Sequence, residues 1–148
     1  MRVWQPNSAF IADDIIFVAA HLQETALPVD LIVVRDGQEA VHYLLREGSY
    51  ATDPRWRHPD LILLDLNLPR LTGREVLDRI RASDSLRATP VVVLTTSRLD
   101  QDVREMYAAG ANTYIEKPPD FRRFVEVLEV IQRYWLHTAL LPTTCEKC

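Results

Sequence analysis

Hydrophobic residues in this chain follow two alternating patterns. Short uninterrupted apolar runs, such as Leu61-Ile62-Leu63-Leu64, are typical of parallel strands that are buried on both faces. Between these runs, apolar residues recur at the spacing of amphipathic helices. The predicted strands are 29–34, 61–65, 91–95 and 113–116, with 9–12 as the candidate first strand. The predicted helices are 38–47, 73–82, 100–108 and a long last helix that begins at Asp120.

This alternation of strands and helices predicts an α/β fold with a parallel sheet. Five strands with helices on both faces suit a flavodoxin-like (βα)5 three-layer sandwich with strand order 2-1-3-4-5. Thr72 stands directly before the 73–82 helix and is its expected N-cap. The sequence shows no internal repeat and no low-complexity tract, so we expect one domain.

Composition narrows the class of protein. The chain has 148 residues, of which 47% are hydrophobic and 26% charged, which is typical of a soluble globular domain. A formal net charge of −4 gives no indication of nucleic-acid binding. No apolar run is long enough to span a membrane, and the first residues lack an apolar signal region, so we expect a cytoplasmic protein. Cys145 and Cys148 lie at the very end of the sequence, where we expect a disordered tail.

Three chemically different polar residues stand at the ends of predicted strands. Asp65 follows one apolar run, Thr95 ends the next, and Lys117 follows the last. Because reactive groups of parallel sheets gather at the carboxyl ends of the strands, we expect all three at the same edge. A carboxylate nucleophile, a hydroxyl donor and a fixed cation are the groups that phosphoryl transfer requires. Thr96 competes with Thr95, but strand alternation allows only one of the two to reach the site.

With this trio, the chain resembles the receiver domains of bacterial two-component response regulators, from about residue 10 to 131. The separations of Thr95 and Lys117 from Asp65 match that family. The resemblance implies that Asp65 accepts a phosphoryl group from a histidine kinase and that Thr95 and Lys117 then bind it. It also implies that Tyr114 is an aromatic switch residue and that a cis bond precedes Pro118.

The same resemblance implies a magnesium ion, bound by Asp65, the backbone carbonyl of Asn67 and an acidic pair after the first strand. Asp13 and Asp14 are the candidates for that pair. A second register remains open, in which the pair falls at Ala9-Phe10 and both carboxylates are missing. The alternative function is therefore a receiver-like interaction module that works without phosphorylation.

The C-terminal part predicts an interface. The last helix is apolar over more than one face, which calls for a second partner besides the sheet. The chain closely resembles the single-domain response regulators of bacterial and cyanobacterial phytochromes. Three segments carry this resemblance: 34–37, Leu61–Pro69 and 134–142. This resemblance implies a phytochrome-type kinase, a receiver domain at 1–137, an arm at 138–148, no output domain and a homodimer. The predicted interface residues are Phe124, Tyr134, Trp135, Leu136, Leu140 and Leu141.

Other functions fit the sequence less well. A phosphatase with Asp65 as nucleophile usually carries a second acid two residues later, and Asn67 cannot transfer that proton. A flavin module needs a phosphate-cradling loop after the first strand, where Asp13 and Asp14 repel phosphate. We therefore expect no enzyme beyond self-phosphorylation and autodephosphorylation. The long loop 48–59 is a decorated surface loop or, through Trp56, a partner contact.

Overall fold

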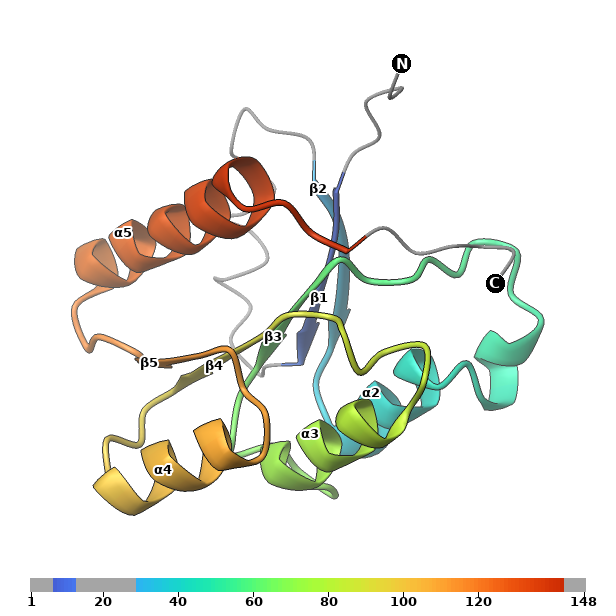
Figure 1. Cartoon of the computed structure of the whole chain (residues 1–148), viewed down its shortest axis with the longest axis horizontal. Helices are drawn as coiled ribbons and strands as arrows, with labels where there is room; N and C mark the ends of the chain where they lie inside the picture. Colours follow the sequence, from blue (N-terminus) through green and yellow to red (C-terminus); the bar gives the residue numbers. More distant parts are fainter. Residues whose placement is uncertain (1–6, 13–28, 143–148) are drawn as a thin grey trace.

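The sheet has five parallel strands in the order β2-β1-β3-β4-β5, as predicted (Figure 1). The computed structural model describes residues 7–12 and 29–142. The strands are β1 (Asn7–Ala12), β2 (Val29–Val34), β3 (Leu61–Leu64), β4 (Val91–Thr95) and β5 (Thr113–Glu116). Every neighbouring pair is parallel, so the chain crosses over between strands and brings their carboxyl ends to one edge.

Helices cover both faces of the sheet. In Figure 1, α5 lies on one side, and α2 and α3 lie on the other. The helices are α2 (Gly37–Leu44), α3 (Gly73–Ala82), α4 (Asp100–Ala108) and α5 (Phe121–Gln132). A short 3-10 helix, η1 (Gly48–Ala51), follows α2, and a π-helical segment, η2 (Arg133–Thr138), extends α5. The predicted three-layer arrangement is confirmed.

Alternation along the central strands produces two separate hydrophobic cores. Ile62 and Leu64 face the core shared with α2, α3 and Met106 of α4. Leu61 and Leu63 face the opposite core, which is shared with α5 and η2. All of β3 and β4 is buried, which explains why these strands read as unbroken apolar runs in the sequence.

Helix α2 is shorter than predicted. Its last residue is Leu44, whereas the apolar pattern extended to Glu47. Arg46 has a φ of 56°, in the left-handed region that ends helices, and Gly48 follows with a φ of 58°. By contrast, α3 begins and ends as predicted, and Thr72 forms the expected N-cap within a full capping box with Glu75.

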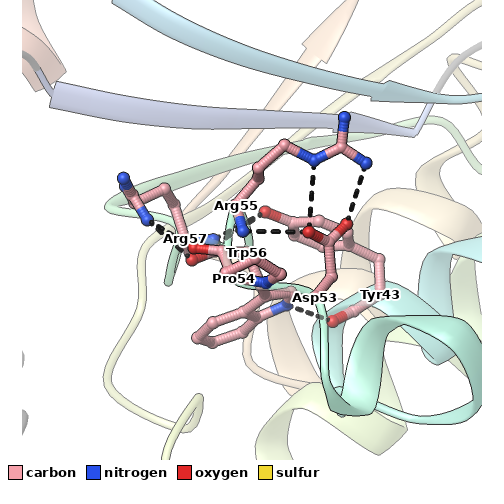
Figure 2. Close-up of polar contacts among 6 residues, drawn as sticks. All are labelled: Tyr43, Asp53, Pro54, Arg55, Trp56 and Arg57. Carbon is pink, nitrogen blue, oxygen red and sulfur yellow. Dashed lines mark hydrogen bonds and ion pairs between the residues drawn. The ribbon is translucent and has the colours of Figure 1, made fainter.

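The long loop after η1 is held against its own domain (Figure 2). The Trp56 indole N–H donates to the carbonyl of Tyr43 at 2.8 Å. The Tyr43 hydroxyl donates to the carbonyl of Arg57 at 2.8 Å and accepts from its N–H at 3.2 Å. Trp56 also packs against the core on the α2 side, and the Arg46 guanidinium lies over its ring. These contacts favour the surface-loop interpretation, because the indole already has partners within the chain.

The C-terminal segment packs partly on its own sheet, and the predicted dimer interface stays a prediction. Phe124 and Leu136 are buried in the core beneath α5, and Trp135 and Leu141 pack against that core. Tyr134 and Leu140 remain exposed, at 52% and 91%. Segment η2 turns Leu136 back toward the sheet, which the apolar pattern alone does not specify. No helix in the described ranges is long and apolar enough to cross a membrane.

Candidate phosphoacceptor site

A buried ion pair lies at the carboxyl edge of the sheet. The Lys117 ammonium contacts Oδ2 of Asp65 at 2.8 Å, and both residues are only 6% exposed. The two residues directly follow β3 and β5, on either side of β4. A buried charge pair of this kind has a high desolvation cost, so it is weak evidence for a purely stabilising role.

The loop after β3 fixes the Asp65 carboxylate. The backbone N–H of Asn67 donates to Oδ1 of Asp65 at 3.0 Å, which forms a tight local turn. The N–H of Gly73 donates to the carbonyl of Leu66 at 3.0 Å and brings the start of α3 onto the same loop. A Cβ at Gly73 would lie 2.2 Å from the Asp65 carbonyl oxygen, so this approach requires glycine.

Thr95 lies between the two charged residues, at the end of β4. It is fully buried, whereas Thr96 is exposed. The Lys117 N–H donates to the Thr95 carbonyl at 2.7 Å, and this bond ties the ends of β4 and β5 together. The sequence prediction that Asp65, Thr95 and Lys117 gather at one edge agrees with this placement.

Tyr114 contacts the loop that follows β4. Its hydroxyl donates to the carbonyl of Ser97 at 2.9 Å, and its half-buried ring packs on the α2-side core. Burial raises the pKa of the Tyr114 phenol, and the hydrogen bond with Ser97 partly opposes that rise. The predicted switch residue is therefore linked to the loop that follows Thr95.

The end of β1 distinguishes between the two registers left open by the sequence. Ala9 and Phe10 lie within β1, paired with both β2 and β3, so they do not follow the strand. The last residue of β1, Ala12, pairs with Leu64, which directly precedes Asp65. Asp13 and Asp14 come next in the sequence and lie outside the described residues. Within the described ranges, no group of three His, Cys, Asp or Glu side chains could hold a metal.

Two further features of this edge differ from the sequence analysis. The described residues contain no cis peptide bond, so the cis bond expected before Pro118 is not found. Sequence reasoning also overlooked Ser97 and Asp102, whose side chains form a hydrogen bond of 2.5 Å. The sequence contains only a weak indication of this bond. The N-cap position of α4 holds Leu99, which has no capping side chain, and the acidic Asp102 lies in the first turn.

Comparisons with known proteins agree with this geometry. Residues 10–129 match the family described as response regulator receiver domain. Response regulator Rcp1 of Synechocystis sp. is 40% identical over 121 residues, which span 82% of this chain and 80% of the relative. The chain belongs to the response regulator receiver domain family of two-component systems.

Solved structures point to one branch of that family. The phosphorylated cyanobacterial phytochrome response regulator RcpA is similar with a TM-score of 0.88 and 38% identity, over 94% of this chain and 100% of that chain. The Mn²⁺-bound form of Rcp1 has a TM-score of 0.86 and 36% identity, over 93% of this chain and 100% of that chain. This chain is thus homologous to phytochrome response regulators, including one solved with a divalent cation.

Proposed function

We propose that this receiver domain is a phosphorylation switch with Asp65 as the phosphoacceptor. The observation that carries the proposal is the buried Asp65–Lys117 pair at 2.8 Å, beside the buried Thr95. An isolated structural carboxylate gains little from burial next to a lysine. A carboxylate that must receive a phosphoryl group needs a nearby cation to balance the added negative charge.

The proposed reaction transfers a phosphoryl group from a phosphohistidine. A carboxylate oxygen of Asp65 attacks phosphorus, and the new O–P bond forms as the P–N bond breaks. The histidine nitrogen leaves with the electron pair and takes up a proton from solvent. Lys117 then binds a phosphoryl oxygen, and the Thr95 hydroxyl donates to another. Conformational switching through Tyr114 follows from the same proposal, together with slow self-phosphorylation and autodephosphorylation.

A magnesium ion fits the donor chemistry of this edge. Asp65 would supply a carboxylate oxygen and Asn67 a backbone carbonyl oxygen, the ligand types that Mg²⁺ prefers. We propose that Asp13 and Asp14, the next residues after β1 in the sequence, complete the set. The ion would supply positive charge for the phosphoryl oxygens. The phosphorylation-independent alternative rested on the register that places the pair at Ala9-Phe10, and the position of both residues within β1 supports the register with Asp13 and Asp14 instead.

Intact mass spectrometry tests the acceptor. Incubation with a small phosphodonor and Mg²⁺ should add one phosphoryl mass to the wild type and none to Asp65→Asn. Asp78→Asn is the matched control, because Asp78 is a half-exposed carboxylate on α3. An adduct that persists in Asp65→Asn would overturn the assignment of Asp65.

Metal binding has its own test, with a readout independent of phosphorylation. Titration of Mg²⁺ against an NMR signal from the Asn67 backbone should give weaker affinity in Asp13→Ala and in Asp14→Ala than in the wild type. Equal affinity in all three proteins would contradict the acidic pair as ligands.

We infer that the kinase partner is a phytochrome-type histidine kinase and that the chain works in the cytoplasm. Similarity to Rcp1 and RcpA, both over most of the chain, supports this partner. A kinase of this class should phosphorylate Asp65 faster than an unrelated histidine kinase does. Equal rates from both kinases would contradict the inference.

We also propose a homodimer through the C-terminal part. Phe121, Val130, Tyr134 and Leu140 are the large apolar side chains of the C-terminal part that stay exposed, by 52% to 91%, and they leave apolar surface uncovered. A symmetric pair could bury this surface on both protomers. Tyr134→Lys together with Leu140→Lys should shift sedimentation from dimer to monomer, whereas substitution of the buried Leu136 should cost stability instead. A wild type that sediments as a monomer at tens of micromolar contradicts this proposal.

A further inference from the structure

The loop 65–72, which carries Asp65 and Asn67, is attached to a helix that it does not join. It connects β3 to α3, but α2 and α3 lie side by side on the same face of the sheet (Figure 1). The N–H of Gly37, at the start of α2, donates to the carbonyl of Pro69 at 3.0 Å. The middle of the loop is therefore held by α2.

Glycine is required at position 37 by this approach of the loop. A Cβ there would lie 2.1 Å from the carbonyl oxygen of Leu71 and 2.7 Å from its Cβ, whereas real Cβ contacts stay above 3.0 Å. The helix itself does not call for glycine, because alanine forms helices more readily. The close contact between Gly37 and the loop therefore explains the residue.

The elements on either side of this contact are firmly packed. In α2, Ala40 and Val41 are buried in the core. In α3, Val76 and Leu77 are fully buried, and a capping box fixes the start of the helix. A displacement of Leu71 must therefore be taken up by the earlier part of the loop, on the side of the proposed phosphoacceptor.

Arg70 shows that the loop is held in a strained conformation. Its φ is 71°, in the left-handed region that is unfavourable for residues with a Cβ. The N–H of Leu71 donates to the carbonyl of Pro69 at 2.9 Å, so the chain makes a three-residue turn around Arg70. The same carbonyl accepts from Gly37, and a strained residue persists only where its surroundings hold it. Loss of that support would let Arg70 relax and would redirect residues 66–69.

We propose that Gly37 is a positioning residue, which holds the Asp65 carboxylate and the Asn67 carbonyl where the metal ion and the phosphoryl group bind. The inference deepens the proposed function and rests on it. Gly37 acts through Pro69 and Leu71. A side chain at this position displaces the loop, so the affinity for Mg²⁺ falls by roughly ten-fold, and phosphorylation by a small phosphodonor slows with it.

The test compares Gly37→Ala with Gly48→Ala, beyond the other end of α2. Alanine is strained at Gly48, where φ is 58°, but among the described residues nothing except its chain neighbours lies within 4 Å of an added Cβ. Both variants should therefore lose stability in chemical unfolding. In the metal-free chain, the NMR signal of the Asn67 amide, which donates to Asp65, should move in Gly37→Ala and stay in place in Gly48→Ala. Titration should then show about ten-fold weaker Mg²⁺ affinity in Gly37→Ala alone.

The outcomes separate this inference from the proposed function. An unmoved Asn67 signal in Gly37→Ala, or the same Mg²⁺ affinity as in Gly48→Ala, overturns the positioning role. If Gly37→Ala does not fold, the wild type decides: Mg²⁺ should shift the amide signal of Gly37 but not that of Gly48, and an unmoved Gly37 signal overturns the inference. If the wild type binds no Mg²⁺ and takes no phosphoryl group, the proposed function fails instead. The metal-free Asn67 signal then decides the positioning role by itself.

Discussion

A cationic side chain lies at each edge of the sheet, but the two cations have different kinds of partner. At the carboxyl edge, Lys117 contacts the carboxylate of Asp65. At the amino edge, Arg81 at the end of α3 bridges the segments that lead into β4 and β5. Its guanidinium donates to four acceptors at 2.7 to 3.0 Å, namely the carbonyls of Arg87, Thr89 and Gly110 and the side chain of Asn112.

This difference separates a part of the molecule that can change from a part that stays fixed. Backbone carbonyls do not titrate and cannot accept a phosphoryl group, so the environment of Arg81 stays constant. Its planar fork suits several fixed acceptors at once. Under the proposed function, the Asp65 carboxylate accepts a phosphoryl group, and a lysine on a flexible stem can follow the new charge. The carboxyl edge therefore suits switching, and the amino edge supports it as a rigid frame.

The largest effect on stability is expected at the buried charge pair. Lys117→Met leaves the Asp65 carboxylate buried without this ammonium, which should lower the free energy of unfolding by about 3 kcal/mol. The double variant with Asp65→Asn should recover most of the loss, because neither charge then remains. Denaturant unfolding with a chelator present measures both values. If Lys117→Met is as stable as the wild type, water must solvate the Asp65 carboxylate in place of the ammonium. The two edges of the sheet would then not differ in the way described.

The amino edge should respond differently. Arg81→Met removes the guanidinium, so the partly buried carbonyls lose their donors. The free energy of unfolding should fall by about 2 kcal/mol. Arg81→Lys keeps the charge but not the fork and should cost about 1 kcal/mol. Phosphorylation of the folded Arg81→Lys chain should keep its wild-type rate. Arg79→Met is the control on the same helix, since Arg79 is exposed, and should change stability by less than about 0.5 kcal/mol.

Sequence predicted the frame of the molecule because its signals are local. The unbroken runs at β3 and β4 and the N-cap at Thr72 each depend on neighbours in the chain. The trio Asp65, Thr95 and Lys117 was predictable because strand ends in a parallel sheet share one edge. Their functional roles were supplied by the family resemblance.

The features that sequence missed depend on distant contacts. The early end of α2 involves Arg46 in a left-handed conformation and Trp56, which reaches back from the loop to the Tyr43 carbonyl. The burial of Phe124 and Leu136 depends on how η2 turns, which an apolar pattern alone does not specify. Ser97 and Asp102 meet only once α4 is placed against the end of β4.

Alkaline pH offers a sharper test of the fixed edge. Burial raises the pKa of the Tyr43 phenol above its ordinary value of 10.0. The folded chain then holds this proton more tightly than the unfolded chain, so the stabilisation is complete below pH 10 and is lost as pH rises through the folded pKa. The free energy of unfolding of the wild type should therefore fall above pH 10 more steeply than that of Tyr43→Phe. At neutral pH, Tyr43→Phe should cost about 1 kcal/mol, because it removes both bonds to Arg57. Identical pH slopes in the two proteins would contradict a buried, hydrogen-bonded phenol.

The smallest expected effect concerns Trp56, whose loop leads toward the amino end of β3. Trp56→Phe removes the indole donor to the Tyr43 carbonyl, but the N–H of Arg46 still donates to that carbonyl at 3.1 Å. The Arg46 guanidinium lies 5.0 Å from the centre of the Trp56 ring and could stack on phenylalanine, although more weakly. The free energy of unfolding should therefore fall by only about 0.5 to 1 kcal/mol, and phosphorylation should not change. Chemical unfolding of Trp56→Phe beside Trp56→Ala measures this, with a larger loss expected in the alanine variant because it also empties the ring's place on the core. If both variants are as stable as the wild type, the loop does not belong to the rigid frame and Trp56 is available for a partner.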